Sequence, residues 1–180
     1  WQNKKIIIVF DGVLSHASIK VNGKPASDSY QSGFYQFSAD ITSLVRSDEP
    51  NLLEVSVTNP AGGDRSKYHD YVGSGDIFAP VYLKIVPETH IQRVAIDAKG
   101  NGNLIMQVIS QNTQPTQLIE VEIQDLKGAI VGSPFSVNAG DHVELKNKLS
   151  MIKSWNPENP QLYQAVICIK DNATTLHTIK

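Results

Sequence analysis

Two places in this sequence hold residues of the types that carry acid–base or ligand-binding chemistry. The first is a pair of carboxylates, Glu120 and Glu122, two positions apart. Two carboxylates on one face of a strand could mimic the acid pair of a hydrolase. They alternate with Ile119, Val121 and Ile123, and this alternation is typical of an exposed face of a β-sheet. We therefore interpret both glutamates as surface residues.

The second place is the polar, glycine-rich stretch 62–75, which contains His69 and Asp70. It shows no apolar periodicity, and a connection of this length is more often functional than a plain link. We expect any ligand of the protein to contact this loop. His69 could assist a polar site there, although a solvated loop histidine is the simpler interpretation.

The histidines and the cysteine of this sequence do not predict a metal site, a cofactor site or a disulfide. The five histidines show no ligand-like spacing, so we expect no metal and no other cofactor. They are His16, His69, His90, His142 and His177. Cys168 is the only cysteine, which excludes an intrachain disulfide. It lies in an apolar run, and we expect a buried thiol that packs as a small hydrophobic group.

Charge and hydropathy argue against two classes of partner. The formal net charge is -2 and the only adjacent basic pair is Lys4 and Lys5, so we expect no nucleic-acid partner. The apolar run 6–10 is far too short to span a bilayer, and we expect no membrane partner. Hydrophobic residues make up 41% of the chain, which is enough for a packed core.

Short strands must position these residues, because no segment has a convincing apolar period of 3.6. In the first half the expected strands are 4–10, 17–21, 34–37, 51–58 and 77–86. Asn22 and Gly23 predict a tight type I′ hairpin, since both central positions need positive φ. Residues 30–33 are expected as a loop. Residues 40–45 are expected either as one helical turn capped by Asp40 or as a bend.

After Pro87 the pattern restarts with six strand-like runs separated by turn signals. These runs are 90–97, 104–110, 118–124, 135–137, 142–149 and 161–170. Short strands at regular spacing argue for β-sandwiches. We therefore predict an all-β chain with two β-sandwich domains, residues 1–87 and 88–180.

Several short motifs, taken in order, resemble glycoside hydrolase family 2. The motifs of the first half are Phe-Asp-Gly-Val at 10–13, Val-Asn-Gly-Lys at 21–24, Gly-Phe-Tyr-Gln-Phe at 33–37, Asp-Ile-Thr at 40–42, Asn-Leu-Leu-Glu-Val-Ser-Val at 51–57 and Ile-Phe-Ala-Pro-Val-Tyr-Leu at 77–83. They resemble the family's sugar-binding jelly-roll domain. The run Trp-Asn-Pro-Glu-Asn-Pro-Gln-Leu-Tyr at 155–163 is similar to the Trp-x-Pro-x-Asn-Pro-x-Leu-Tyr element of the family's immunoglobulin-like domain.

This resemblance, strongest to the β-galactosidase branch, implies a partial jelly roll over 1–87, galactose-binding-like and without its N-terminal strands. It implies an immunoglobulin-like sandwich over 88–180. In the family the two catalytic glutamates lie in a (β/α)₈ barrel, which would begin at Lys180. We therefore expect a non-catalytic accessory region, not an enzyme by itself. The alternatives are a free-standing carbohydrate-binding module and a structural or oligomerisation scaffold.

The resemblance also implies one substrate-binding residue, Asp70, and no catalytic or metal-binding residue. In such β-galactosidases an aspartate at this place reaches into the sugar pocket, where a carboxylate accepts hydrogen bonds from hydroxyl groups. Three residues depart from the family pattern, with Val72 in place of an aromatic residue, Asp76 in place of a glycine and Ala79 in place of an arginine. The loss of the arginine predicts relaxed docking, a degenerate paralogue or a deliberate mutation, and the three departures together leave open whether function is lost.

Aromatic residues give two further expectations. We expect Trp155, followed by Pro157 and Pro160, to anchor with Tyr163 inside the second sandwich or at its interface with the barrel; sugar stacking is the alternative. A sugar-stacking platform in the first half would consist of Trp1, Tyr30, Tyr35, Tyr68 and Tyr71. The expected partners are carbohydrate, the catalytic barrel and, through open strand edges, a second copy of the chain. A polysaccharide-degrading bacterial parent favours a periplasmic or extracellular location.

Overall fold

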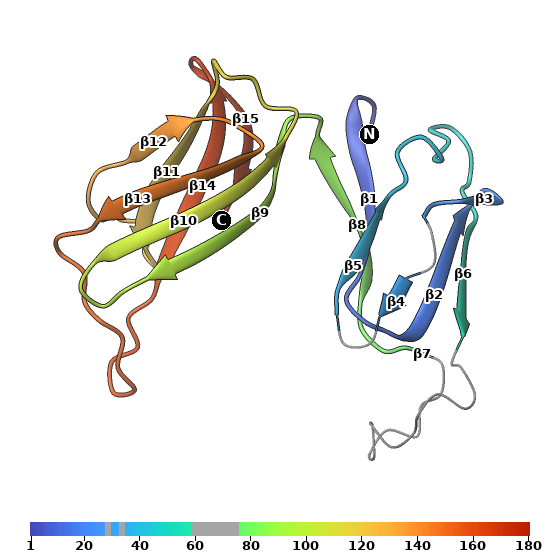
Figure 1. The fold of residues 1–180 in the computed structure, drawn as a ribbon, viewed down its shortest axis with the longest axis horizontal. Coiled ribbons are helices and arrows are strands. Elements are labelled where there is room, and N and C mark those ends of the chain that lie inside the picture. The colour runs from blue at the N-terminus through green and yellow to red at the C-terminus, as the bar shows by residue number, and fades with distance from the viewer. Residues whose placement is uncertain (28–29, 33–34, 59–75) are drawn as a thin grey trace. The chain divides into compact units, whose positions relative to one another are not determined.

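The computed structural model describes residues 1–27, 30–32, 35–58 and 76–180, and their regular structure is entirely β-strand (Figure 1). The chain divides into two compact units, Trp1–Val86 and Pro87–Lys180, called unit 1 and unit 2 below. Each unit contains two sheets around its own apolar core. The predicted all-β class with two sandwiches is confirmed. No helix of the described residues could cross a membrane.

Two sheets form the sandwich of unit 1. Its strands are β1 (Lys4–Phe10), β2 (Val13–Val21), β3 (Lys24–Pro25), β4 (Tyr30–Ser32), β5 (Phe37–Asp40), β6 (Leu53–Thr58), β7 (Asp76–Ile77) and β8 (Val81–Pro87). One sheet has the order β5-β1-β8, and the other places β3, β4, β6 and β7 against β2. Strand β1 is apolar on both faces because both become buried near its end, with Ile8 and Phe10 buried on one face and Val9 on the other.

The core of unit 1 is built mainly by alternate residues of β1 and β2. Phe10 is fully buried and stacks on Phe37 of β5, with ring centroids 5.0 Å apart. The other buried residues of this core are Ile6, Ile8, Val13, Ala17, Ile19, Val21, Ala39 and Ile41. Burial of each large apolar side chain stabilises the unit by about 1.5–3 kcal/mol, so these two strands carry most of the packing.

The hairpin and the capped turn of unit 1 form as predicted. Asn22 and Gly23 both have positive φ, 53° and 77°, as a type I′ turn requires. After β5 the chain makes a single turn, in which Leu44 and Val45 donate their backbone N–H to the carbonyl of Ile41. Asp40 caps this turn, because its Oδ1 accepts the N–H of Thr42 at 3.0 Å.

Three strand predictions for unit 1 are wrong. Strand β2 begins at Val13, not at residue 17, because Val13 and Leu14 pair with β7. Residues 30–32 form β4 rather than a loop, since they pair with the middle of β2. The expected strand 34–37 begins only at Phe37, where Tyr30 stacks on the Phe37 ring at 4.4 Å.

A fourth prediction, a continuous strand over 77–86, is also wrong. The chain breaks between β7 and β8 at Phe78, Ala79 and Pro80. Proline has no N–H for a ladder, and the carbonyl of Pro80 instead accepts the N–H of Asp11 at 3.0 Å. The ring of Phe78 lies over Gly12, where an added Cβ would be 2.4 Å from Phe78 Cζ. The break therefore fits closely against the β1–β2 connection.

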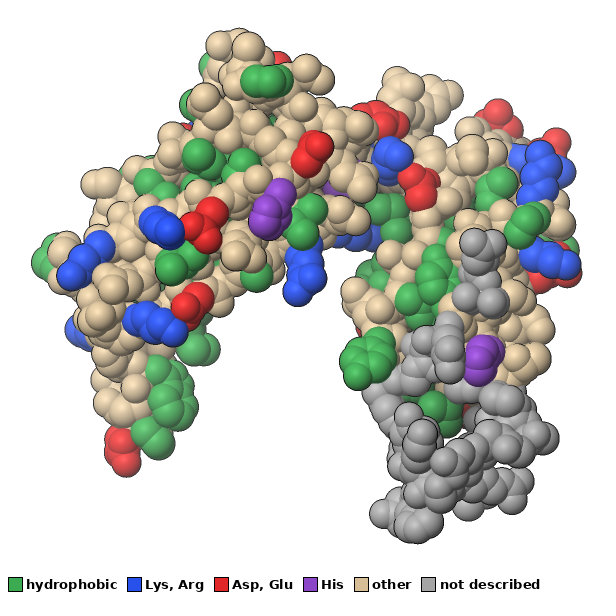
Figure 2. Space-filling model, in the orientation of Figure 1, with side chains coloured by type: hydrophobic (Ala, Val, Ile, Leu, Met, Phe, Trp, Pro, Cys, Tyr) green, Lys and Arg blue, Asp and Glu red, His purple; other side chains and the backbone are tan. Residues whose placement is uncertain are grey.

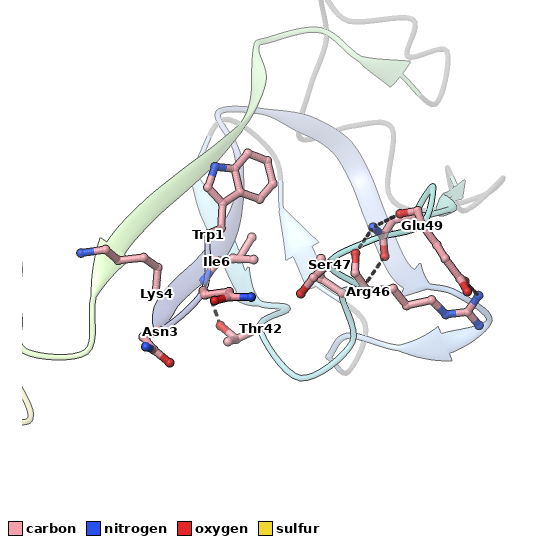
Figure 3. A pocket seen from close by; sticks show the side chains of 11 residues that line it. Trp1, Asn3, Lys4, Ile6, Thr42, Arg46, Ser47 and Glu49 are labelled. Carbon is pink, nitrogen blue, oxygen red and sulfur yellow. Dashed lines mark hydrogen bonds and ion pairs between the residues drawn. The ribbon is translucent and has the colours of Figure 1, made fainter.

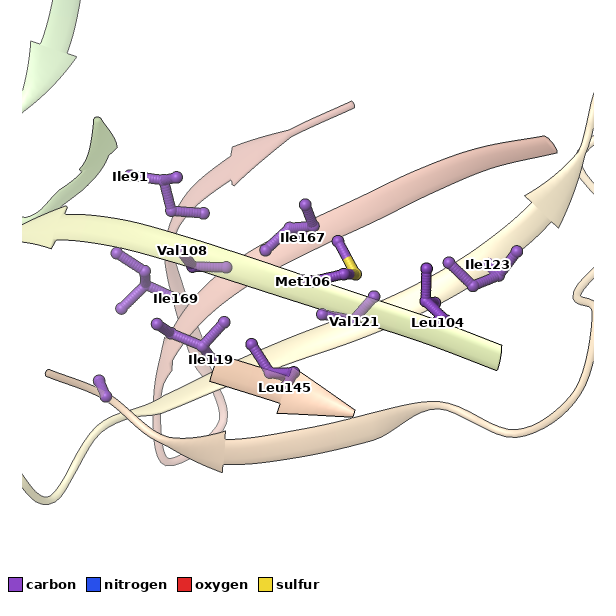
Figure 4. Close-up of a cluster of buried hydrophobic side chains, with 11 residues drawn as sticks. Ile91, Leu104, Met106, Val108, Ile119, Val121, Ile123, Leu145, Ile167 and Ile169 are labelled. Carbon is purple, nitrogen blue, oxygen red and sulfur yellow. The ribbon is translucent and has the colours of Figure 1, made fainter. Parts of the chain in front are cut away.

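Unit 2 is a sandwich of a three-stranded and a four-stranded sheet. Its strands are β9 (His90–Ala98), β10 (Asn103–Gln111), β11 (Leu118–Asp125), β12 (Phe135–Asn138), β13 (His142–Lys148), β14 (Tyr163–Asp171) and β15 (Thr174–Ile179). The sheet orders are β13-β10-β9 and β12-β11-β14-β15. Figure 4 shows the core between them, to which β10 contributes Leu104, Met106 and Val108.

All six strand-like runs predicted for unit 2 are strands, but two details of this half are wrong. Strand β15 was missed because its sequence, Thr-Thr-Leu-His-Thr-Ile, is largely polar; it forms by pairing with β14. Cys168 is only half-buried. Its neighbours Ile167 and Ile169 point into the core, so the thiol faces outward, 3.3 Å from Thr178 Oγ1.

Candidate functional site

The one substrate-binding residue expected from the sequence, Asp70, lies outside the described residues, as do His69 and Val72. The structure does define the two strands that flank this segment. Thr58, at the end of β6, pairs with His16, and Asp76, at the start of β7, pairs with Leu14. The segment that carries Asp70 therefore leaves and rejoins the sheet within two positions of β2, near the start of that strand.

Three polar side chains meet next to the start of β2. Gln36 donates from Nε2 to Asp11 Oδ1 at 2.7 Å and to Tyr82 Oη at 3.3 Å. Asp11 follows β1, Gln36 precedes β5 and Tyr82 lies in β8, so each neighbouring strand of one sheet supplies one group. We call Asp11, Gln36 and Tyr82 the polar triad.

The polar triad combines a carboxylate, an amide and a phenol, which are groups that bind sugar hydroxyls. Sequence reasoning missed it because the three residues are far apart in the chain. The register supplies the missing signal, since Phe10 pairs with Phe37 and the next positions along the two strands are Asp11 and Gln36. Correct pairing of two predicted strands would therefore have found two of the three residues.

Two of the residues that depart from the family pattern, Asp76 and Ala79, are among the described residues. Asp76 is exposed and pairs with Leu14. Ala79 is half-buried and directly precedes Pro80, whose carbonyl accepts the Asp11 N–H. A methyl side chain at position 79 offers no hydrogen-bond donor to this region. The effect of both residues on function stays a prediction.

A separate pocket of about 670 Å³ lies in unit 1 beside the first residues of the chain (Figure 3). Three of its polar side chains have hydrogen-bond or ion-pair partners within the pocket. Thr42 Oγ1 accepts the N–H of Ile6 at 2.9 Å, and Arg46 forms an ion pair with Glu49 at 2.9 Å. Figure 3 shows the Trp1 ring near Ile6, away from that ion pair. Thr42, Arg46 and Glu49 therefore hold the backbone and one another at this pocket.

Near this pocket, Asp40 is held as a carboxylate by Lys5 and Thr42. Lys5 Nζ lies 2.9 Å from Asp40 Oδ2, and Thr42 donates to Oδ1. Partial burial acts to raise the pKa of Asp40, but the hydrogen bonds from Thr42 and Lys5 outweigh it, so the pKa is lowered. This ion pair ties β1 to β5.

The glutamates of β11 do not act as a pair. Glu120 accepts a hydrogen bond from Lys170, and Glu122 accepts one from Gln124. The Glu120 carboxylate raises the pKa of Lys170, as expected for an ion pair. Both glutamates face outward but are half-buried. Each carboxylate therefore has its own structural partner on the sheet surface.

Trp155 does not pack inside the second sandwich, so that part of the expectation is wrong. Its side chain is 57% exposed. Tyr163 instead fixes the backbone of the loop, because its hydroxyl accepts the N–H of Lys153 at 2.7 Å. Tyr163 thus holds this loop, while Trp155 in the same loop is exposed to solvent. An interface role for Trp155 stays a prediction.

Tyr30, one member of the predicted stacking platform, packs within unit 1. Tyr30 stacks on Phe37 and donates its hydroxyl to the Ser38 carbonyl at 2.8 Å, so its ring is committed to the core of unit 1. Tyr68 and Tyr71 lie outside the described residues. Within residues 1–27, 30–32, 35–58 and 76–180, no three His, Cys, Asp or Glu side chains gather as metal ligands would.

Comparison with known proteins relates this chain to one family of enzymes. The profile of glycosyl hydrolases family 2 matches residues 89–180. The chain is 25% identical to a β-galactosidase of Thermoanaerobacter pseudethanolicus over 191 residues, covering 93% of this chain and 24% of the relative. It is 29% identical to a β-galactosidase of Clostridium acetobutylicum over 177 residues, covering 93% of this chain and 19% of the relative.

Solved structures agree with the observed fold. A family 2 member from Bacteroides cellulosilyticus has a TM-score of 0.79 at 25% identity, covering 99% of this chain and 26% of that one. A β-glucuronidase from Bacteroides uniformis has a TM-score of 0.78 at 22% identity, covering 99% and 24%. The chain spans about a quarter or less of the curated β-galactosidases given above. Because the family profile covers half of the sequence, the chain belongs to glycosyl hydrolases family 2.

Proposed function

We propose that this chain is a non-catalytic accessory region of a larger family 2 glycoside hydrolase that acts on terminal β-linked sugars, most like a β-galactosidase. One observation carries the proposal. The chain aligns along 93–99% of its own length with β-galactosidases of which it covers only 18–24%. A region with this coverage corresponds to one part of the relatives, and both of its units are β-sandwiches.

Retaining hydrolysis of a glycosidic bond requires two carboxyl groups about 5 Å apart on either side of the bond. The adjacent glutamates of this chain, Glu120 and Glu122, each have a structural partner on the β11 surface. The reacting carboxylates would then come from the remaining part of the parent, the expected (β/α)₈ barrel. Asp70 would contribute sugar binding.

Turnover of a chromogenic β-galactoside tests the proposal. Residues 1–180 alone are expected to release no chromophore above the buffer rate, whereas the product of the complete reading frame should release it. Asp70→Asn in the complete product should raise KM, with Asp48→Asn as the surface control. Turnover by residues 1–180 alone would overturn the accessory role, and a complete product inactive on all β-glycosides tested would overturn the parent's activity.

A carbohydrate-binding module is a second candidate function, which the polar triad favours. The hydroxyl of Tyr82 and the carboxylate of Asp11 are both within hydrogen-bond distance of the Gln36 amide, and all three groups can also bind hydroxyls. Calorimetric titration of residues 1–180 with galactose and β-galactosides tests it. Binding that is weakened by Gln36→Ala and unchanged by Gln92→Ala would support it, and heats no different from buffer would contradict it.

A scaffold role in self-association is favoured by the apolar surface around β7 and β8. The exposed hydrophobic residues there are Ile77, Phe78, Val81, Tyr82 and Leu83. Apolar patches of this kind are common at protein interfaces. Light scattering over a concentration series decides this alternative, because a species that stays monomeric at high concentration contradicts it.

A further inference from the structure

Two histidines of unit 2 lie where the edges of its two sheets meet. His90 belongs to β9, the edge strand of the three-stranded sheet, and His177 belongs to β15, the edge strand of the four-stranded sheet. Their ring centroids are 6.1 Å apart, and the two rings are nearly perpendicular. His90 is 1% exposed and His177 is half-buried. Neither residue has a part in the proposed function.

His177 joins the two sheets by a hydrogen bond to the backbone. The N–H of Ile91 in β9 donates to Nδ1 of His177 at 3.1 Å. Because β9 is an edge strand, some of its backbone groups have no partner within its own sheet, and the imidazole supplies one for Ile91. Ile91 is 1% exposed, so little water could replace the imidazole if this bond were lost.

Irregular pairing in both strands brings these two groups together. In β15 the register against β14 shifts between Thr175 and His177, which makes Leu176 an extra residue. In β9 the register against β10 shifts directly after Ile91, which makes Gln92 an extra residue. Bulges of this kind change the direction of the neighbouring side chains and backbone groups. A bulge thus lies on each side of the contact between the sheets.

The hydrogen bond requires a neutral His177. Only an unprotonated ring nitrogen accepts a hydrogen bond, and a protonated imidazole would instead direct a second N–H at the N–H of Ile91. The bond of His90 differs in this respect. Its Nδ1 lies 3.1 Å from the carbonyl oxygen of Glu88, which can only accept, so Nδ1 donates there in either charge state. His177 is therefore the residue whose contact is sensitive to a proton.

The other charged groups around His177 keep their charge near neutral pH. On the side of β9 these groups are His90 and Glu88, and on β14 the nearest is Lys170, which is paired with Glu120. Carboxylates and amines do not change charge between about pH 5.5 and 7.5. Figure 2 shows that the charged side chains on the displayed face of unit 2 are mostly of these two kinds, with fewer histidines. An effect of pH in this range therefore originates at an imidazole.

We propose that His177 is an acid-sensitive latch, which holds the edge strand β15 against β9 while it is neutral and releases it when it binds a proton. An unperturbed histidine binds a proton near pH 6.5. The latch is thus closed at pH 7.5 and opens as the pH falls through that range. Opening separates two sheet edges, and unpaired edges are places where a strand of another chain can pair.

Nuclear magnetic resonance of residues 1–180 tests the latch through exchange of the Ile91 amide at pH 7.5 and 5.0. Each rate is divided by that of an unstructured peptide at the same pH, so that only protection is compared. Protection of Ile91 should fall on the order of tenfold in the wild type. His177→Asn keeps an acceptor that cannot bind a proton, so its protection should be equal at both pH values. His142→Asn, at an exposed position of β13, is the matched control and should behave as the wild type does.

The wild type alone decides the matter if His177→Asn does not fold. The ring nitrogen shifts of His177 and the amide shift of Ile91 should then change together, with the same midpoint pH. An Ile91 amide that follows the midpoint of His90, or that follows neither histidine, would overturn the latch. Protection that is equal at both pH values in the wild type, or that is lost equally in the wild type and in His177→Asn, would overturn it as well.

Discussion

Asp40 links the stability of unit 1 to pH at the scale of a single residue. Its pKa is lowered in the folded chain by hydrogen bonds from Thr42 and Lys5. A carboxylate with a lowered folded pKa stabilises the protein above its unfolded pKa, and this contribution is lost as pH falls through the folded value. Asp40→Asn should therefore destabilise unit 1 at pH 7 by about 0.2–1 kcal/mol, the range for a partly exposed ion pair.

The test is urea unfolding of both proteins at pH 7, 5 and 3. The difference between wild type and Asp40→Asn should persist at pH 5 and shrink at pH 3, because the carboxyl of the unfolded chain binds a proton below its pKa of about 3.9, whereas the folded carboxylate binds one only at lower pH. Asp48→Asn, in the exposed loop that follows, serves as the control. A difference that is constant from pH 7 to pH 3 would show that Asp40 acts by packing rather than by charge.

At the scale of elements, Gly102 fixes the position of the β13–β14 loop relative to the β9–β10 turn. Its φ is +87°, and an added Cβ would lie 2.1 Å from the Leu149 carbonyl oxygen. Gly128 has nearly the same φ, +86°, but an added Cβ there meets nothing within 4 Å. Left-handed backbone costs a non-glycine residue about 1–2 kcal/mol, so both Ala substitutions should destabilise unit 2, and Gly102→Ala should do so more strongly.

Chemical unfolding of the two alanine variants separates the backbone term from the clash. The loss of unfolding free energy in Gly128→Ala comes from the backbone conformation alone. The additional loss in Gly102→Ala therefore measures the cost of displacing Leu149. Hydrogen exchange of residues 149–162 should also accelerate in Gly102→Ala only. Equal destabilisation by the two substitutions would mean that the loop base moves without resistance.

The elements that could be predicted from sequence are those whose strand pattern is local. Strand β10 alternates buried positions with exposed or half-buried ones throughout, and a period of two identifies such a strand without its partners. Strands β4 and β15 are short or polar and exist because they pair with β2 and β14. Pairing is a non-local property, and this explains both misses.

The same limit applies to the candidate site. The expected binding residue, Asp70, came from the family resemblance and lies outside the described residues. The polar triad came only from the structure, because Asp11, Gln36 and Tyr82 meet through the register of three strands. Trp155 was expected to anchor inside the second sandwich or at its interface with the barrel, because apolarity of a side chain does not reveal whether its own domain or a partner covers it.

At the scale of the whole molecule, the two separate cores predict that a core truncation acts on one unit. Met106 is fully buried in the core of unit 2, and Ile8 is buried in the core of unit 1. Truncation of such a side chain to alanine costs about 2–5 kcal/mol, because it removes contacts and leaves a cavity. Met106→Ala should therefore lower the free energy of unfolding of unit 2, and Ile8→Ala should lower that of unit 1.

Hydrogen exchange followed by mass spectrometry assigns each effect to its unit. In Met106→Ala, exchange should accelerate in β10, β11 and β14, which share that core, and much less in β1 and β2. The reverse is expected for Ile8→Ala. Ile105→Ala is the control in β10, because Ile105 faces outward and surface substitutions usually change stability by less than about 0.5 kcal/mol. Equal acceleration in both units by either core variant would mean that the two sandwiches unfold as one cooperative body, and that each stabilises the other despite its separate core.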